Sequence, residues 1–175
     1  MSNLINDLQS LVPDYAKDIK LNIESVLNGS GGIDKEIDAP YIAFASAIAT
    51  GNIKLIKIIE KYLTSDVDKQ AAKTAAIIMA QNNIWYSFVE MMSDPEVSNS
   101  PAGLRMNAIA TSGGTEKTKF EGYSLAASII GKCKPCTTSH FKQLKDFGYK
   151  TSQLNTIIKI ASVINALSKI LILED

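Results

Sequence analysis

Apolar residues recur at helical spacing along most of this chain, and no other feature limits its fold so strongly. Long segments place apolar side chains every three to four residues, with strong helix formers between them. Alternating apolar and polar residues bounded by turn residues, the pattern of a half-buried strand, are scarce. The sequence therefore predicts an all-α fold.

Breaks in this pattern divide the chain into predicted helices. The glycines of Gly29–Gly32 end the first helix, because glycine suits left-handed C-cap geometry and has a high entropic cost inside a helix. Gly51 and Asn82-Asn83 mark further breaks. The predicted helices run from Ile5 or Pro13 to Leu27, Asp38 or Ala39 to Ala49, Ile53 to Leu63, Val67 to Ala80, Ile84 to Met92, Met106 to Ala110, Lys117 to Ile130 and Thr151 to Leu173, with a loop containing Pro95 and Pro101.

Length and composition indicate one domain, spanning residues 1–175. A chain of 175 residues buries most of its unfolded surface without disulfide or metal staples. Its 46% apolar and 21% charged residues are typical of soluble globular proteins. A weak internal repeat lays residues 76–84 on residues 128–136, which would make two similar helical halves of this domain.

Charge and hydropathy exclude several classes of partner. The 18 basic residues equal the 18 acidic ones and form no long run, so nucleic acid is not an expected partner. The N-terminus lacks a positive region followed by an apolar stretch, so no secretory signal is expected. Lys159, Asn165 and Lys169 interrupt the most apolar segment, which predicts no membrane span. We expect a cytoplasmic protein.

Both cysteines and the single histidine lie within eight residues, in the segment Cys133-Lys134-Pro135-Cys136 and at His140. Without an export signal, such a cysteine pair is more often catalytic or metal-binding than a structural staple. Pro135 predicts a helix start with Lys134 as N-cap, Pro135 at the first helical position and Cys136 at the second. Unpaired amides and the positive end of the helix dipole favour the thiolate there, which is the nucleophilic form of cysteine.

His140 follows Cys136 by four residues, one helical turn along the same face. A histidine at this spacing is within reach to take or give a proton. Cys133 lies close enough in sequence to form a disulfide with Cys136, provided that the backbone brings their Cβ atoms within about 4 Å. The segment has the residue types of a dithiol redox site.

Three other interpretations of the cysteine pair are less favoured. Structural zinc needs four ligands, and the chain offers three soft ones, so a carboxylate or a second subunit would have to complete the site. A purely structural pair would not explain the nearby histidine. A thioredoxin-type motif follows a strand, and no strand pattern precedes Cys133. We expect neither a metal nor a bound cofactor.

With these residues in place, the chain resembles the alkylhydroperoxidase AhpD family over nearly its whole length. The family pattern of a glutamate on the preceding helix followed by Cys-x-x-Cys-x-x-x-His is matched by Glu121, Cys133, Cys136 and His140. Two further stretches resemble the family as well: Pro13–Asn22 and Gly103–Asn107. One departure is Pro135, which stands where a histidine often precedes the second cysteine of the family.

The resemblance implies an all-helical antioxidant peroxidase, often trimeric, that reduces alkyl hydroperoxides. In this scheme Cys136 attacks the peroxide and becomes a sulfenic acid, and Cys133 is the proton donor and resolving thiol that closes a redox-active disulfide with it. Glu121 and His140 would form a proton relay. The implied reductant is dihydrolipoamide, as a lipoyl group on a dehydrogenase-complex subunit or another dithiol donor.

Two alternative functions remain open from the sequence. One is a carboxymuconolactone decarboxylase-like protein whose dithiol serves another reaction, although such chemistry does not require paired cysteines. The other is a redox sensor in which the bond between Cys133 and Cys136 switches an interface. Rapid turnover of peroxide would separate an enzyme from a sensor, because a sensor is oxidised once.

The relay imposes a geometric condition on Glu121. Twelve residues of straight helix would place it about 18 Å from Cys133, so the chain must reverse around Gly131-Lys132. Without the family resemblance, Glu121 is best interpreted as a solvated carboxylate on a helix face. Lys132 and Lys134 are similarly interpreted as ordinary exposed lysines. Three aromatic residues are predicted to pack in the core or at a subunit interface: Trp85, Tyr86 and Phe88.

Overall fold

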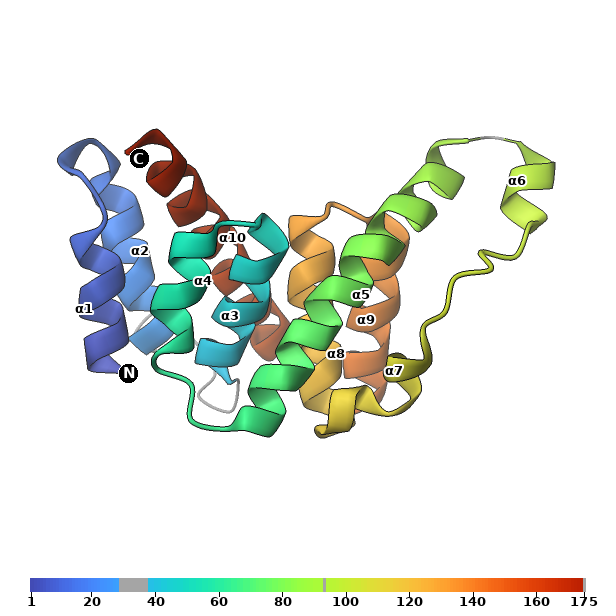
Figure 1. Cartoon of the computed structure of the whole chain (residues 1–175), viewed down its shortest axis with the longest axis horizontal. Coiled ribbons are helices and arrows are strands. Elements are labelled where there is room, and N and C mark those ends of the chain that lie inside the picture. Colours follow the sequence, from blue (N-terminus) through green and yellow to red (C-terminus); the bar gives the residue numbers. More distant parts are fainter. Residues whose placement is uncertain (29–37, 93, 175) are drawn as a thin grey trace.

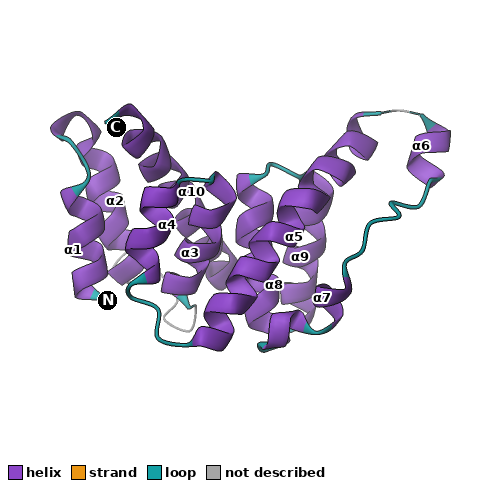
Figure 2. Cartoon of the chain, in the orientation of Figure 1, coloured by secondary structure: helices purple, strands orange, loops and turns teal. Residues whose placement is uncertain are grey.

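A computed structural model describes residues 1–28, 38–92 and 94–174 of the chain, and all regular structure within these ranges is helical. The prediction of an all-α fold is confirmed (Figure 2). The α-helices are α1 (Ser2–Ser10), α2 (Lys17–Asn28), α3 (Ala39–Thr50), α4 (Ile53–Glu60), α5 (Asp66–Met91), α6 (Pro95–Asn99), α7 (Asn107–Ala110), α8 (Lys117–Ile130), α9 (Lys134–Asp146) and α10 (Thr151–Leu173), and short 3-10 turns occupy Asp14–Ala16 and Ser112–Gly114.

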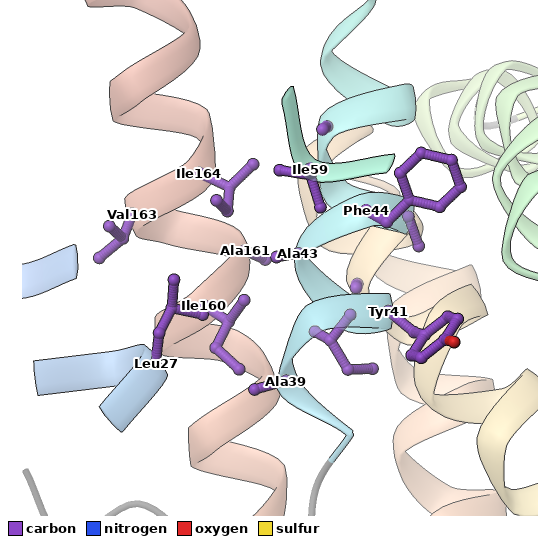
Figure 3. Packing of buried hydrophobic residues seen from close by; sticks show 14 of the residues in the cluster. Leu27, Ala39, Tyr41, Ala43, Phe44, Ile59, Ile160, Ala161, Val163 and Ile164 are labelled. Carbon is purple, nitrogen blue, oxygen red and sulfur yellow. The ribbon is translucent and has the colours of Figure 1, made fainter. Parts of the chain in front are cut away.

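The helices stand side by side, with α1 and α2 at one end and α5, α8 and α9 at the other (Figure 1). Helices α3 and α10 lie between these groups and contact each other closely. Ala43 of α3 faces Ala161 of α10, with Ile160 and Ile164 beside them (Figure 3). Alanines allow the two backbones to approach, while the larger residues fill the space around them. This apolar centre supports the more polar end of the molecule.

Helix α10 has the length and apolar composition of a membrane-crossing helix, in spite of Lys159 and Lys169. By this criterion the expectation that the two lysines disqualify the segment was wrong. Just over half of its most apolar stretch, 56%, is buried inside the structure. It contacts α2, α3 and α8, and the apolar side chains that these contacts cover are those of a core helix.

Helix α5 runs without a break through Asn82-Asn83, where the sequence predicted an interruption. Both asparagines are buried, and the side-chain amide of Asn83 donates a hydrogen bond to the carbonyl of Ala127 at 3.2 Å. Asparagine disfavours helices because its side chain competes for nearby backbone groups. Here the tertiary contact with α8 occupies that side chain, so the helix continues.

Two further predicted boundaries were wrong. Of the two predicted starts of the helix that ends at Leu27, Ile5 was wrong, because the chain is extended at Pro13 and separates α1 from α2; the alternative start at Pro13 lies just before the 3-10 turn that leads into α2. The predicted loop around Pro95 contains the short helix α6, whose N-cap Asp94 accepts hydrogen bonds from the amides of Glu96 and Val97. The predicted glycine stop at Gly29–Gly32 lies outside the described residues.

The chain reverses between α8 and α9, as the relay geometry required. Lys132 adopts a left-handed backbone with φ of 55°, an uncommon conformation for a side-chain-bearing residue. Gly131 is needed for a different reason, because a Cβ built on it would lie 2.0 Å from Nδ2 of Asn83. The close approach of Gly131 to α5 and the turn at Lys132 bring α9 back against α8 and α5.

Candidate active site

The two cysteines lie at the start of α9, one residue out of the predicted register. Cys133 is the N-cap, and its Sγ accepts a hydrogen bond from the backbone amide of Cys136 at 3.2 Å. Lys134 is therefore already helical, and Pro135 and Cys136 occupy the second and third helical positions. Proline disfavours helical geometry in the residue before it, but this sulfur cap outweighs that effect at Lys134. Proline itself is tolerated in the first turn, because the amides there have no intrahelical partner. Cys136 still lies in the first turn.

Cys133 and Cys136 form a disulfide across a Cα–Cα distance of 5.3 Å. Both residues are buried, but they face different surroundings. Cys133 borders a shallow open hollow of about 340 Å³, beside Lys132 and Lys134. Cys136 lines a deeper cavity on the other side of the helix start. The two buried cysteines thus border hollows on different sides of the helix start.

Glu121 and His140 form a buried pair beside the cysteines. Oε2 of Glu121 lies 2.6 Å from Nδ1 of His140, and the two residues are 1% and 6% exposed. A carboxylate only accepts hydrogen bonds, so the Nδ1–H group donates and fixes the orientation of the imidazole ring. The interpretation of Glu121 as a solvated surface carboxylate was wrong. The turn at Gly131-Lys132 brings this residue of α8 to a residue of α9.

The other imidazole nitrogen faces a methionine that the sequence did not single out. Nε2 of His140 lies 3.1 Å from Sδ of Met79 on α5. A thioether accepts hydrogen bonds weakly and cannot donate them, so a hydrogen bond at this contact requires a proton on Nε2. Met79 fits the apolar pattern of a core helix, and no local spacing connects it to His140. Only the packing of α5 against α9 reveals it.

A cavity of about 410 Å³ joins these groups, within the size range of small-molecule sites. Apolar and uncharged polar side chains make up most of its wall, and the sulfur-bearing residue Cys136 and the base His140 complete it. Tyr86, which was predicted to pack in the core or at a subunit interface, is half-buried and also lines this cavity. The lining residues are Met79, Asn82, Tyr86, Met106, Ile109, Pro135, Cys136, Ser139, His140 and Gln143.

Lysine and arginine side chains are absent from the described lining of this cavity. Lys134 is turned outward and pairs with Glu90 of α5 at 2.9 Å, its side chain 81% exposed. Among the described residues, no three histidine, cysteine, aspartate or glutamate side chains converge on a point that would hold a metal ion.

Together, the fold and the site define a class: an all-α protein with a dithiol at a helix start, beside a buried carboxylate–imidazole pair. No family model matches the chain. It is 39% identical over 176 residues to the alkyl hydroperoxide reductase AhpD of Coxiella burnetii, covering 98% of this chain and 99% of that protein. It is 38% identical over 165 residues to AhpD of Streptomyces griseus, covering 93% and 92%. It is 36% identical over 172 residues to AhpD of Maricaulis maris, covering 98% and 99%.

The chain belongs to the AhpD family of alkyl hydroperoxide reductases. This membership supports a peroxidase-type oxidoreductase role.

Proposed function

We propose that this protein is a thiol peroxidase that reduces alkyl hydroperoxides through a dithiol–disulfide cycle of Cys133 and Cys136. One observation carries the proposal: Cys136, which is disulfide-bonded to Cys133, lines a ligand-sized cavity together with the imidazole of the Glu121–His140 pair. Nucleophile, acid–base group and substrate space are the parts that such a reaction needs.

Cys136 is the residue that attacks the peroxide, because it lines the cavity and Cys133 does not. In the reduced protein its thiolate attacks one peroxide oxygen, the O–O bond breaks and an alkoxide leaves. His140 supplies a proton to the alkoxide, giving the alcohol, while Cys136 becomes a sulfenic acid. The sulfur loses two electrons and the peroxide gains them.

Cys133 resolves this intermediate. Its thiol attacks the sulfenic sulfur of Cys136, the S–O bond breaks, and water leaves as the disulfide forms. The amide of Cys136 holds the sulfur of Cys133 at 3.2 Å, so the resolving sulfur is already positioned at the helix start. This hydrogen bond also favours a thiolate on Cys133 when the disulfide is reopened.

Glu121 and His140 act as the proton relay of the site. The carboxylate accepts from Nδ1–H at 2.6 Å, which orients Nε2 and stabilises the ring when it is charged. Because Glu121 occupies Nδ1, Nε2 is the ring nitrogen that exchanges a proton with the substrate. The burial of both groups keeps bulk water from competing with the relay.

Reduction of the disulfide requires a dithiol, and we assign this role to a dihydrolipoyl group on a partner protein. One lipoyl thiolate attacks the disulfide and its second thiol displaces the mixed disulfide, leaving two protein thiols and an oxidised lipoyl ring. The open hollow beside Cys133 offers room for a carrier, and Lys132 and Lys134 at its rim favour an acidic one.

Self-association is part of the same proposal. An exposed apolar stripe follows one side of α5 at spacings of seven and four residues, formed by Ile77, Ile84 and Phe88. Such a stripe suits the helices of a second copy of the chain. A homotrimer agrees with the family resemblance, and we place this assembly in the cytoplasm, with neither a membrane nor nucleic acid as partner.

The test is steady-state consumption of cumene hydroperoxide with dihydrolipoamide as reductant. Turnover should vanish in Cys136→Ser and Cys133→Ser and fall sharply in His140→Phe. A matched variant, Lys142→Ala, changes an exposed residue of α9 that lines neither the cavity nor the hollow, and it should keep the rate within a few-fold. A native chain that is oxidised once by peroxide but never cycles with any dithiol would contradict the enzyme and favour the redox sensor.

A further inference from the structure

Met79 is a second oxidisable sulfur inside the proposed peroxide cavity. It is 1% exposed, so oxidants in bulk solvent have little access to it, yet its side chain forms part of the cavity wall with Cys136. The thioether of methionine reacts with hydroperoxides to give a sulfoxide. A molecule admitted to the cavity for Cys136 therefore also meets this sulfur.

The contact with His140 places an acid–base group directly beside the sulfur of Met79. Nε2 of His140 lies 3.1 Å from Sδ, and Nδ1 is held by Glu121 on the opposite side of the ring. When Nε2 carries a proton, a peroxide beside Sδ has an acid next to its leaving oxygen. General-acid assistance of this kind contributes typically about 10²–10⁴-fold to a rate.

Two other methionines provide a comparison within the same chain. Met106 lines the same cavity, and the described contacts of the His140 ring are to Glu121 and Met79. Met91 lies outside the cavity and is 74% exposed. If exposure to solvent determined the rate of oxidation by hydroperoxide, Met91 would be oxidised fastest of the three. If the cavity and its acid determined that rate, Met79 would be oxidised fastest.

We infer that Met79 is a modification site, converted to methionine sulfoxide by hydroperoxide when the cysteines are held as the disulfide. In that state Cys136 cannot consume the peroxide, and the thioether is the nucleophile beside the His140 acid. This inference rests on the proposed function in one respect only, that a hydroperoxide enters the cavity.

The step balances without a further reactant. A lone pair of Sδ attacks the terminal peroxide oxygen, the O–O bond breaks, and the alkoxide takes the proton from Nε2 of His140. The hydroxysulfonium that remains returns its proton to Nε2 of His140, which gives the sulfoxide and restores the ring. Sulfur is oxidised by two electrons and the hydroperoxide is reduced to the alcohol.

The product would shut down the relay. The sulfoxide oxygen is a much stronger acceptor than a thioether and lies on the sulfur that faces Nε2, so it holds the proton that the peroxide would otherwise receive. A peroxidase whose reductant fails would thus become inactive in proportion to the oxidation of Met79. The site then couples activity to the supply of dithiol.

The experiment exposes the disulfide form of the whole protein to cumene hydroperoxide without reductant and follows the gain of about 16 Da, one oxygen, at each methionine. Chymotryptic peptides are used, because Trp85, Tyr86 and Phe88 separate Met79 from Met91. Met79 should gain oxygen at least about tenfold faster than Met91 and Met106. In guanidinium chloride, where the fold is lost, the three rates should become equal.

Equal or slower oxidation of Met79 than of Met91 in the folded protein would overturn the inference. His140→Gln keeps a hydrogen-bonding side chain but removes the acid, and it should slow Met79 to the rate of Met106; an unchanged rate would also overturn it. In Met79→Leu, the rate of peroxide turnover after exposure to hydroperoxide, expressed relative to the rate of the same variant before exposure, should fall less than in the native chain. Because oxidation is read by mass on the disulfide form, a lack of dithiol turnover would contradict the proposed function without affecting this result.

Discussion

Asp68 and Glu121 are two buried carboxylates at the contact between α5 and α8, and they have different partners. Asp68 of α5 accepts hydrogen bonds from the hydroxyl of Thr115 and from Nζ of Lys119, the latter at 2.9 Å. Glu121 lies two residues further along α8 than Lys119 and holds the imidazole of His140 at 2.6 Å. One carboxylate is paired with a lysine ammonium group, the other with an imidazole ring.

Under the proposed function, the difference separates a structural carboxylate from one that takes part in the chemistry. Burial alone would raise the pKa of Asp68, but the hydrogen bonds from Thr115 and Lys119 outweigh it and lower the pKa below its usual range. Asp68 is therefore a fixed charge that ties α5 to α8. Glu121 makes its contact on the cavity side, through a ring that also faces Met79. Removing each charge should affect a different property of the protein.

The largest effect is expected for Glu121→Gln measured as peroxide turnover. Gln keeps an oxygen that accepts from Nδ1–H, so His140 keeps its orientation, but the charge that stabilises the protonated ring is lost. Turnover should fall by about 10²–10⁴-fold, while the midpoint of urea unfolding stays near that of the native chain. Asp68→Asn serves as the matched carboxylate and should keep turnover within about threefold. Equal losses of turnover in the two variants would contradict a role for Glu121 in turnover that Asp68 does not share.

Gly131→Ala tests the turn that brings Glu121 to His140. The new Cβ would meet Nδ2 of Asn83 at 2.0 Å and Cγ at 2.6 Å, so either α5 or the turn must shift. Overpacking of this kind costs typically about 1–3 kcal/mol of unfolding free energy, measured by urea denaturation. Turnover should fall as well. Gly148→Ala is the control at a turn where a Cβ meets no neighbour, although its φ of 89° adds backbone strain. Unchanged turnover in Gly131→Ala would show that the relay tolerates a displaced turn.

The sequence predicted those parts of the site that depend on local spacing. Cys133, Cys136 and His140 lie within one segment, and helical periodicity places them together. Glu121 required the family resemblance, because its contact with His140 crosses a chain reversal that depends on an unusual backbone at Lys132. Met79 was missed, since it reaches the site through the packing of α5 on α9.

The fold shows the same division. The apolar pattern of the sequence predicted the bounds of α8 and α10 that the structure has, because the helical spacing and the residues that end a helix indicate the same limits in these two segments. It predicted a break in α5 at Asn82-Asn83, since the propensity of asparagine is local. The hydrogen bond from Asn83 to Ala127 that overrides this propensity comes from another helix. What a residue touches across the fold is the information that a single sequence lacks.

Asp68→Asn should act on stability, with a pH dependence of predictable sign. Loss of the charged hydrogen bonds to Lys119 and Thr115 is expected to lower the free energy of unfolding by about 1–3 kcal/mol at pH 7. Because the pKa of Asp68 is lowered in the folded protein, its contribution is present above the unfolded value of about 3.9 and is lost as pH falls through the folded value. Urea denaturation of both proteins from pH 7 to pH 3 should show the difference shrinking below about pH 4. A difference that stayed constant over this range would mean that the Asp68 charge contributes nothing.

The smallest effect is expected for the exposed pair of Lys134 and Glu90, which serves as a reference for both buried carboxylates. Its atoms lie 2.9 Å apart, but the lysine side chain is 81% exposed, so water already solvates the charges. Exposed pairs contribute about 0–1 kcal/mol, and Lys134→Ala should leave the unfolding midpoint almost unchanged. Oxidation of the reduced protein by peroxide should also be unaffected, because that step occurs on the Cys136 side.

Re-reduction should separate the two sides of the disulfide. With an acidic lipoylated carrier, Lys134→Ala should slow reduction a few-fold and weaken its dependence on salt, because Lys134 is at the rim of the hollow beside Cys133. With free dihydrolipoamide, which has no acidic surface, the rate should not change. Equal slowing with both reductants would mean that Lys134 acts in the thiol chemistry itself. No slowing with either reductant would mean that the carrier approaches from the other side, where Cys136 lines the cavity.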